Sequence, residues 1–461
     1  MIDIPQEIWL KILEYLSIPE AGRLLSVNRP LFNIVMNRRY RNAQIGPVSG
    51  KVSRSVLLHW ESIAPRVRSL SIQTNETRAP SRTKACFLHS LWLLTKLGAY
   101  LIPDDMMILP PFCPAAIPSK DLLRLMDRFT LVHEFKLDGL DINNETCHYA
   151  ASLYSPLVKK AFDVFGSNLV SLEISLSVGA FHRYFDPLNV FPMLQHFILH
   201  LAEGKTLEAT RTAISSSILP TLNRHRDTLR SLSMDAWKNV EPSVLLHGLD
   251  YMPLLTSFAL TTTYDPSCNY ALLAGLHAFF ARQGSTTNAL KLEFFAVDSI
   301  PDYNTWFREP CFGTPLPFLK SLTLRLYDFP ETFIESLSTY VSQFKATLDT
   351  LILKGEPLNE DKKRGVRERY GYATTSSSMT VPRFSIQQAE QLGEMLSIIS
   401  PNHIRDLQLE MQSLHADLYV PPLQYYPQIK TFSARFHYVL VGTDVMGSGK
   451  EEASFSYIRY Y

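Results

Sequence analysis

The sequence predicts an α/β protein in which a short three-helix module precedes a long array of strands backed by helices. Three observations lead to this prediction. A spacing of three apolar residues, LxxLxL, recurs along most of the chain, and its last two positions share one face of a strand. Helical patterns lie between many of these spacings. The first 45 residues carry helical patterns without the repeat, so the predicted domains are residues 1–45 and 46–461.

The N-terminal module is predicted from its apolar spacing. Ile8, Ile12 and Leu16 recur at helical intervals, and Pro5 fits a first helical turn because that turn tolerates a missing N–H. Residues 17–20 break this helix, and two further apolar runs follow. Three short helices bury little surface by themselves, so their spare apolar faces either cap the array or bind a partner.

The same residues resemble the F-box family. The family's LPxEI, ILxxL and VCRxF-like blocks occur in order as Ile4-Pro5-x-Glu7-Ile8, Ile12-Leu13-x-x-Leu16 and Leu24-x-x-Val27-x-Arg29 followed by Phe32. The chain departs from the pattern in having Ile4 in place of Leu, Asn28 in place of Cys, and Pro30 directly after Arg29. The resemblance covers residues 4–45 and implies binding to the Skp-type adaptor of SCF (Skp–cullin–F-box) ubiquitin ligases. The adaptor contacts that it implies are Ile4, Pro5, Ile8, Ile12, Leu13, Leu16, Val27 and Phe32.

The repeat is recognised by its spacing. The central residues of the LxxLxL units are Leu70, Phe135, Leu172, Phe197, Leu232, Phe258, Leu292, Leu322, Leu351, Leu407 and Phe432. Six steps lead from Leu172 to Leu351, a mean of about 30 residues per step. The pattern resembles leucine-rich repeats in a degenerate form, because the Asn or Cys expected after the strand is mostly absent. The resemblance implies a horseshoe-shaped solenoid of parallel strands backed by helices.

A doubly wound α/β sheet is the alternative fold, although it would need longer all-apolar strands and a Gly-rich switch-point loop. Polar or proline-rich stretches at 74–84 and 103–118 break the period, and an insertion is predicted at 357–382. A long insertion in a compact fold is usually functional or disordered. The helices predicted between strands are Cys86–Tyr100, Lys120–Phe129, Thr206–Leu219, Tyr270–Arg282, Glu331–Phe344 and Ile386–Ile399.

Composition limits the class of protein. Hydrophobic residues make up 46% and charged residues 19% of the 461 residues, which excludes a disordered chain. Lys plus Arg is 45 and Asp plus Glu is 44, a net charge of +1, which disfavours a dedicated nucleic-acid binder. Five dispersed cysteines without a CxxC pair indicate buried thiols, and no apolar run is long enough to cross a membrane. We therefore expect a cytoplasmic or nuclear protein with neither nucleic acid nor membrane as a partner.

No pattern of catalytic, metal-binding or cofactor-binding residues is found in the sequence. Gly447-Ser448-Gly449-Lys450 lacks the spacing of a phosphate-binding loop at both ends. His196 and His200 share one face of a strand, but no third zinc ligand can be placed beside them. An α/β hydrolase or transferase therefore has no motif in its favour. We expect a chain without catalytic residues, metal or cofactor.

The outward-facing strand positions are the remaining candidate site. Lys291, Phe295, Arg325 and Lys354 place an aromatic residue among cations, a combination suited to an acidic or phosphorylated peptide; an ordinary solvated sheet face is the alternative. The F-box resemblance implies a substrate-recognition subunit of an SCF-type ligase, which binds the adaptor through residues 1–45 and an unknown protein substrate through the repeats. The alternative is a leucine-rich-repeat interaction scaffold with a helical cap and no ligase.

Overall fold

The computed structural model describes part of the chain. The described residues are 8–9, 11–12, 15–16, 20, 29–45, 63–73, 119–139, 146–186, 189–202, 207–236, 240–264, 269–296, 316–325, 331–355, 404–415, 431–440 and 453–458. The predicted helices Cys86–Tyr100 and Ile386–Ile399 lie outside them, as do the stretches at 74–84 and 103–118, the insertion at 357–382 and Gly447–Lys450. The chain divides into two compact units, Met1–Leu194 and Gln195–Tyr461, which are considered separately.

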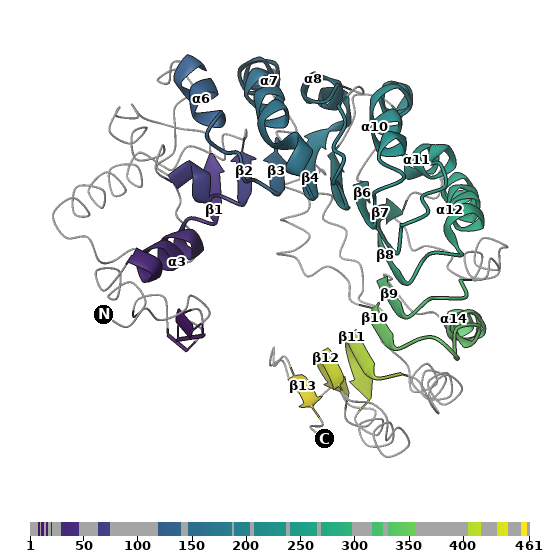
Figure 1. Cartoon of the computed structure of the whole chain (residues 1–461). Helices are drawn as coiled ribbons and strands as arrows, with labels where there is room; N and C mark the ends of the chain where they lie inside the picture. The colour runs from purple at the N-terminus through teal and green to yellow at the C-terminus, as the bar shows by residue number, and fades with distance from the viewer. Residues whose placement is uncertain are drawn as a thin grey trace, which may run out of the picture. The chain divides into compact units, whose positions relative to one another are not determined.

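The first unit contains four parallel strands in sequential order, β1-β2-β3-β4 (Figure 1). Helix α3 precedes the strands, α6 lies between β2 and β3, α7 lies between β3 and β4, and α8 follows β4. The bounds are α3 Arg29–Arg39, β1 Asn42–Ile45, β2 Ser69–Gln73, α6 Ser119–Met126, β3 Glu134–Asp138, α7 Thr146–Phe165, β4 Ser171–Ser177 and α8 Phe181–Tyr184.

The second unit continues the pattern with strands β5 to β13 in sequential order. All neighbours are parallel except β12 and β13, which are antiparallel. Helices α10, α11, α12 and α14 lie on one face of the neighbouring strands (Figure 1). The bounds are β5 His196–Ala202, α9 Leu207–Ala213, α10 Leu219–Arg224, β6 Ser231–Ala236, α11 Pro242–Gly248, β7 Ser257–Tyr264, α12 Asn269–Gln283, β8 Ala289–Ala296, β9 Ser321–Arg325, α14 Glu331–Ser342, β10 Thr350–Gly355, β11 Asp406–His415, β12 Thr431–Leu440 and β13 Ala453–Ile458.

This topology confirms the predicted fold class. Sequential parallel strands with intervening helices on one face are the arrangement of a leucine-rich-repeat-like solenoid. A doubly wound sheet would reverse its strand order at a switch point, and neither unit does so. The horseshoe curvature expected for the whole array stays a prediction.

The repeat spacing predicted which side chains are buried. In β6 and β7, for example, Leu232, Met234, Phe258 and Leu260 are at most 1% exposed, as their alternation with polar residues requires. The exception is β8, where Leu290, and not the predicted Leu292, aligns with Phe258 and Leu322. The predicted register of this strand was therefore wrong by two residues.

The described structure also contains elements that the sequence analysis did not predict. Strand β1 lies within the predicted N-terminal module, yet it pairs with β2 as the first strand of the sheet. Helices α7 and α11 and the antiparallel strand β13 were also missed. The helices predicted at 120–129, 206–219, 270–282 and 331–344 are confirmed by α6, by α9 with α10, by α12 and by α14.

Most of the strands are preceded by a backbone carbonyl that is hydrogen-bonded to the next strand. The residue just before a strand, here called the pre-strand residue, accepts two N–H groups from the start of the next strand. The Arg230 carbonyl, for example, accepts from Thr256 N at 2.9 Å and Ser257 N at 3.0 Å. Thr256, Asn288 and Lys320 do the same one, two and three strands further on. These bonds satisfy the backbone groups at the N-terminal ends of the strands and fix the register between neighbouring strands.

Large aromatic residues fill the layer between strands and helices. In the first unit, the Phe135 ring lies 5.6 Å from that of Phe162 and 5.5 Å from that of Phe165. In the second unit, Phe258 of β7 packs on Phe279 of α12 at 4.2 Å. Such ring contacts add about 0.5–1.5 kcal/mol beyond the area that they bury. The strands are therefore held on a rigid base, and their opposite side chains form a fixed surface.

Candidate functional site: two surfaces of the repeat protein

The N-terminal residues that match the F-box pattern are partly described. Ile8 and Ile12 are helical, and their side chains are 47% and 37% exposed. They lie four residues apart, a spacing that puts two residues on one face of a helix. Tyr15, in the turn that follows, is 88% exposed. Leu16 is half-buried at the following bend. Ile4, Pro5, Leu13 and Val27 lie outside the described residues.

Helix α3 presents the remaining predicted contact, Phe32, which is 39% exposed. Ile34 and Val35, on another side of the same helix, are buried. The Arg66 guanidinium, on the turn before β2, binds Asn33 Oδ1 at 3.2 Å and Asn37 Oδ1 at 2.6 Å. These contacts hold α3 against the turn that precedes β2, while Phe32 remains accessible.

The second surface is the strand face opposite the helices in the second unit. On this face the register aligns one residue from each of six strands, β5 to β10, and these residues are here called the charged row. The members of the charged row are His200, Asp235, Thr261, Glu293, Arg325 and Lys354. Neighbouring strands are about 4.8 Å apart, so opposite charges in adjacent members are within reach of each other.

Three of the predicted substrate residues lie in or beside the charged row. Glu293 Oε1 accepts from Arg325 Nε at 3.4 Å, and these side chains are 10% and 12% exposed. Lys291 Nζ lies 3.2 Å from Glu293 Oε2 and remains 47% exposed. Lys354 is the register neighbour of Arg325 and is half-buried. The buried Glu293 therefore offsets one positive charge of the predicted cationic patch, and Lys291 is its most accessible cation.

Phe295 does not lie where the predicted register put it. The two-residue shift in β8 aligns Phe295 with Thr263, two residues along the strand from the charged row. Lys291 and Glu293, by contrast, align with Thr323 and Arg325 of β9. Phe295 is therefore displaced by two residues along the strand from the position beside Arg325 that was predicted for it.

His200 pairs with a carboxylate. Its Nδ1 lies 2.6 Å from Asp235 Oδ2 of the next strand, whereas His196 is exposed at the start of β5. Within the described residues, no group of three or more His, Cys, Asp or Glu side chains is placed to hold a metal ion. The same part of the chain has no helix long and apolar enough to cross a membrane.

A buried carboxylate stabilises the start of α11. Glu241 is 5% exposed, and its oxygens accept from Arg211 at 2.7 Å and from Ser243 Oγ at 2.7 Å. Burial alone would raise the pKa of Glu241, but the hydrogen bonds from Arg211 and Ser243 outweigh it, so the pKa lies below its ordinary value. Hydrogen bonding and attraction to Glu241 raise the pKa of the Arg211 guanidinium. This pair is structural, because it joins α9 to α11.

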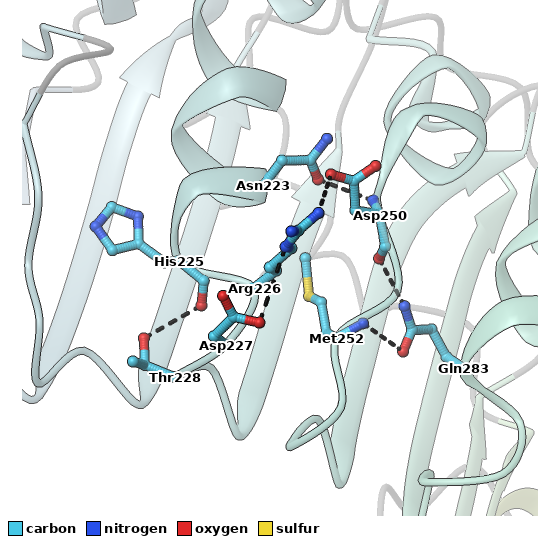
Figure 2. Close-up of polar contacts among 8 residues, drawn as sticks. All are labelled: Asn223, His225, Arg226, Asp227, Thr228, Asp250, Met252 and Gln283. Atoms are coloured by element: carbon cyan, nitrogen blue, oxygen red, sulfur yellow. Dashed lines mark hydrogen bonds and ion pairs between the residues drawn. The ribbon is translucent and has the colours of Figure 1, made fainter.

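A polar network holds the turns before β7 (Figure 2). The fully buried Gln283 donates from Nε2 to the Asp250 carbonyl at 2.8 Å and accepts at Oε1 from Met252 N at 3.2 Å. Asn223 Oδ1 accepts from Asp250 N at 2.9 Å, and Arg226 Nη1 lies 3.2 Å from Asp250 Oδ2. Sequence reasoning missed Gln283, because nothing in its neighbourhood marks a turn-binding amide.

The fold and its polar strand face define a leucine-rich-repeat-like protein. No protein-family model matches the sequence, and no curated protein matches it either. Among solved structures, one chain of the crystal structure of the Rad7 and Elc1 complex in yeast is similar. The sequence identity is 11% and the TM-score 0.37, over 96% of this chain and 90% of that chain. A likeness of this degree adds nothing to what the strand order already shows.

Proposed function

We propose that this chain is the substrate-recognition subunit of an SCF-type ubiquitin ligase. The F-box-like N-terminus binds a Skp-type adaptor, and the repeats bind a protein target. The supporting observation is that Ile8, Ile12 and Phe32, three positions at which the F-box resemblance implies adaptor contacts, are exposed apolar side chains. Exposed apolar residues grouped on one helix face are typical of a docking site.

The proposed mechanism is proximity. The chain holds the target near a ligase core, which raises the effective concentration of activated ubiquitin at the target's lysines. No residue of this chain makes or breaks a bond in this scheme, so it is a non-catalytic subunit without a cofactor. The proposed location is the cytoplasm or the nucleus.

Titration of the full chain with a purified Skp-type adaptor tests the proposal. Ile8→Asp combined with Ile12→Asp puts two charges on the exposed helix face. Burying each partly exposed side chain in an interface is worth about 1 kcal/mol, so the double variant should weaken binding by roughly 30-fold or more. The matched control, Val190→Asp with Leu254→Asp, changes two apolar residues of similar exposure, 54% and 44%, elsewhere in the chain. The control should bind as the wild type does.

Two outcomes would refute the proposal: no adaptor binding by the wild type, or equal binding by the two double variants. A scaffold without a ligase is the second candidate, because the same exposed face could dock a different partner. Proximity labelling with the full chain and with the Ile8→Asp and Ile12→Asp variant separates the two candidates. Ligase subunits lost from the variant would support the receptor; their absence from both forms would favour the scaffold.

A further inference from the structure

The near-neutral charge of the chain conceals a strongly basic segment. Residues 21–75 contain nine Lys and Arg and a single acidic residue, Glu61. The rest of the chain therefore holds 36 Lys and Arg against 43 Asp and Glu, a net charge of −7, whereas residues 21–75 carry +8. Six of these cations are described, and they lie in α3 or just before β1 and β2: Arg29, Arg38, Arg39, Arg41, Arg66 and Arg68.

The structure brings part of this charge to the N-terminal ends of two neighbouring strands, β1 and β2. Arg41 and Arg68 are the pre-strand residues of β1 and β2, and the Arg41 carbonyl accepts from Arg68 N at 2.7 Å and Ser69 N at 3.0 Å. The Arg68 carbonyl accepts in turn from His133 N at 2.8 Å, just before β3. Adjacent strands lie about 4.8 Å apart, so the two arginine side chains start from the neighbouring N-terminal ends of paired strands.

The hydrogen bonds described for these cations go to neutral oxygens. Arg68 Nη1 donates to the Pro65 carbonyl at 3.2 Å and the Val67 carbonyl at 3.3 Å. Arg66, on the preceding turn, binds the side-chain oxygens of Asn33 and Asn37. Arg41 is exposed. These bonds orient the guanidinium groups without neutralising them. Among the described residues, none of the three arginines forms an ion pair, and the basic edge is defined here as Arg41, Arg66 and Arg68.

We propose that the basic edge is a docking surface for a short acidic segment of a partner protein. Carboxylates on such a segment match the guanidinium groups in charge and hydrogen-bonding geometry. Nucleic acid is the weaker fit, because the chain as a whole carries a net charge of only +1, whereas nucleic-acid binders usually carry a basic surplus. A short acidic segment contacts only the positive charges of the basic edge. This inference does not rest on the F-box proposal.

Fluorescence anisotropy with a labelled peptide of alternating Asp and Glu, about six residues and roughly 20 Å long, tests the inference on the full chain. A peptide of Ser and Gln of equal length is the neutral probe. The wild type should bind the acidic peptide more tightly than the neutral one at low salt, and about 0.5 M NaCl should abolish the difference by screening. Equal binding of both peptides at low salt would overturn the proposal.

Charge reversal locates the surface. Arg41→Glu with Arg68→Glu should weaken acidic-peptide binding about tenfold or more, and Arg41→Gln with Arg68→Gln should have a smaller effect. The matched control is Arg230→Glu with Lys320→Glu, since these are exposed pre-strand residues of β6 and β9 and the net charge changes equally. Circular dichroism checks that each variant is folded. An equal loss in the control, unchanged binding by the Arg41 and Arg68 variants, or tighter binding of a single-stranded RNA or a DNA duplex than of the peptide would refute the proposal.

Discussion

Replacing the buried amide of Gln283 by a side chain of similar volume should loosen the turn before β7. Gln283→Leu removes both hydrogen bonds of the amide and leaves the Met252 N–H and the Asp250 carbonyl without this partner. Each buried backbone group that loses its partner costs about 1–3 kcal/mol, and the apolar gain of Leu offsets part of that cost. We expect a net destabilisation of about 2–4 kcal/mol.

Arg226→Ala is the matched control within the same network. Its ion pair with Asp250 joins two side chains that are 50% and 49% exposed, so solvent screens it. Such pairs contribute about 0.5 kcal/mol or less. Figure 2 shows both interactions meeting at Asp250, one from Gln283 and one from Arg226.

Hydrogen exchange at the Met252 amide gives a local readout, because repeat arrays open in segments. Gln283→Leu should reduce protection of this amide by roughly 30- to 1,000-fold, the equivalent of about 2–4 kcal/mol. Arg226→Ala should change the protection about twofold. If the two variants exchange alike, or if Met252 stays protected without Gln283, the proposed role of the buried amide is wrong.

Two further predictions concern the contacts of α11. The pKa of Glu241 is held below its ordinary value of 4.5, so its pairing stabilises the fold above that pH and the contribution is lost as the pH falls through the lowered pKa. In urea unfolding, Glu241→Gln should therefore be destabilising at pH 7, and this loss should shrink progressively as the pH is lowered below 4.5. Glu208→Gln, at a carboxylate that is 83% exposed, should change the stability little at any pH in this range. A loss for Glu241→Gln that does not shrink with falling pH would contradict this. Gly275→Val should cost about 1–3 kcal/mol of stability, because a Cβ at this position lies 2.9 Å from Ser243 Cα. Gly179→Val, with no atom within 4 Å of its Cβ, should change the thermal stability little. If Gly179→Val were the more destabilising of the two, the packing argument would be refuted.

The alternation of apolar residues predicted most of the strands because burial on one face demands it. It failed at β8, where the first repeat position is Thr287, a fully buried polar residue whose hydroxyl donates to the Gln283 carbonyl at 3.0 Å. Because Thr287 breaks the apolar pattern, the next apolar set, with Leu292 at its centre, was taken as the repeat. A side chain satisfied by a bond to the preceding helix cannot be recognised from hydropathy.

Helix α7 was missed for a related reason. Pro156 lies inside it, and proline normally ends a helix because it removes a backbone donor. Ser155, next to it, donates to the Arg183 carbonyl at 2.6 Å, which ties this part of α7 to α8. The packing partner that stabilises the irregular helix is distant in sequence, so local propensity gave no sign of it.

The candidate substrate face shows the same limit. Sequence spacing identified Lys291 and Arg325 as outward-facing, but the pairing of Arg325 with Glu293 depends on the register between two strands 32 residues apart. Ion pairs of this kind follow from strand alignment, which the two-residue error in β8 obscured. The F-box resemblance, by contrast, needs no long-range alignment, since its positions lie within residues 4–32.

Assembly with the adaptor tests the central claim most directly. The full chain and a purified Skp-type adaptor, mixed in equal amounts, are separated by size-exclusion chromatography with light scattering. We expect the wild-type chain and the adaptor to form a one-to-one complex. The Ile8→Asp and Ile12→Asp double variant should fail to form it, and the Val190→Asp and Leu254→Asp double variant should still form it. Separate elution of the wild-type chain and the adaptor would contradict this expectation.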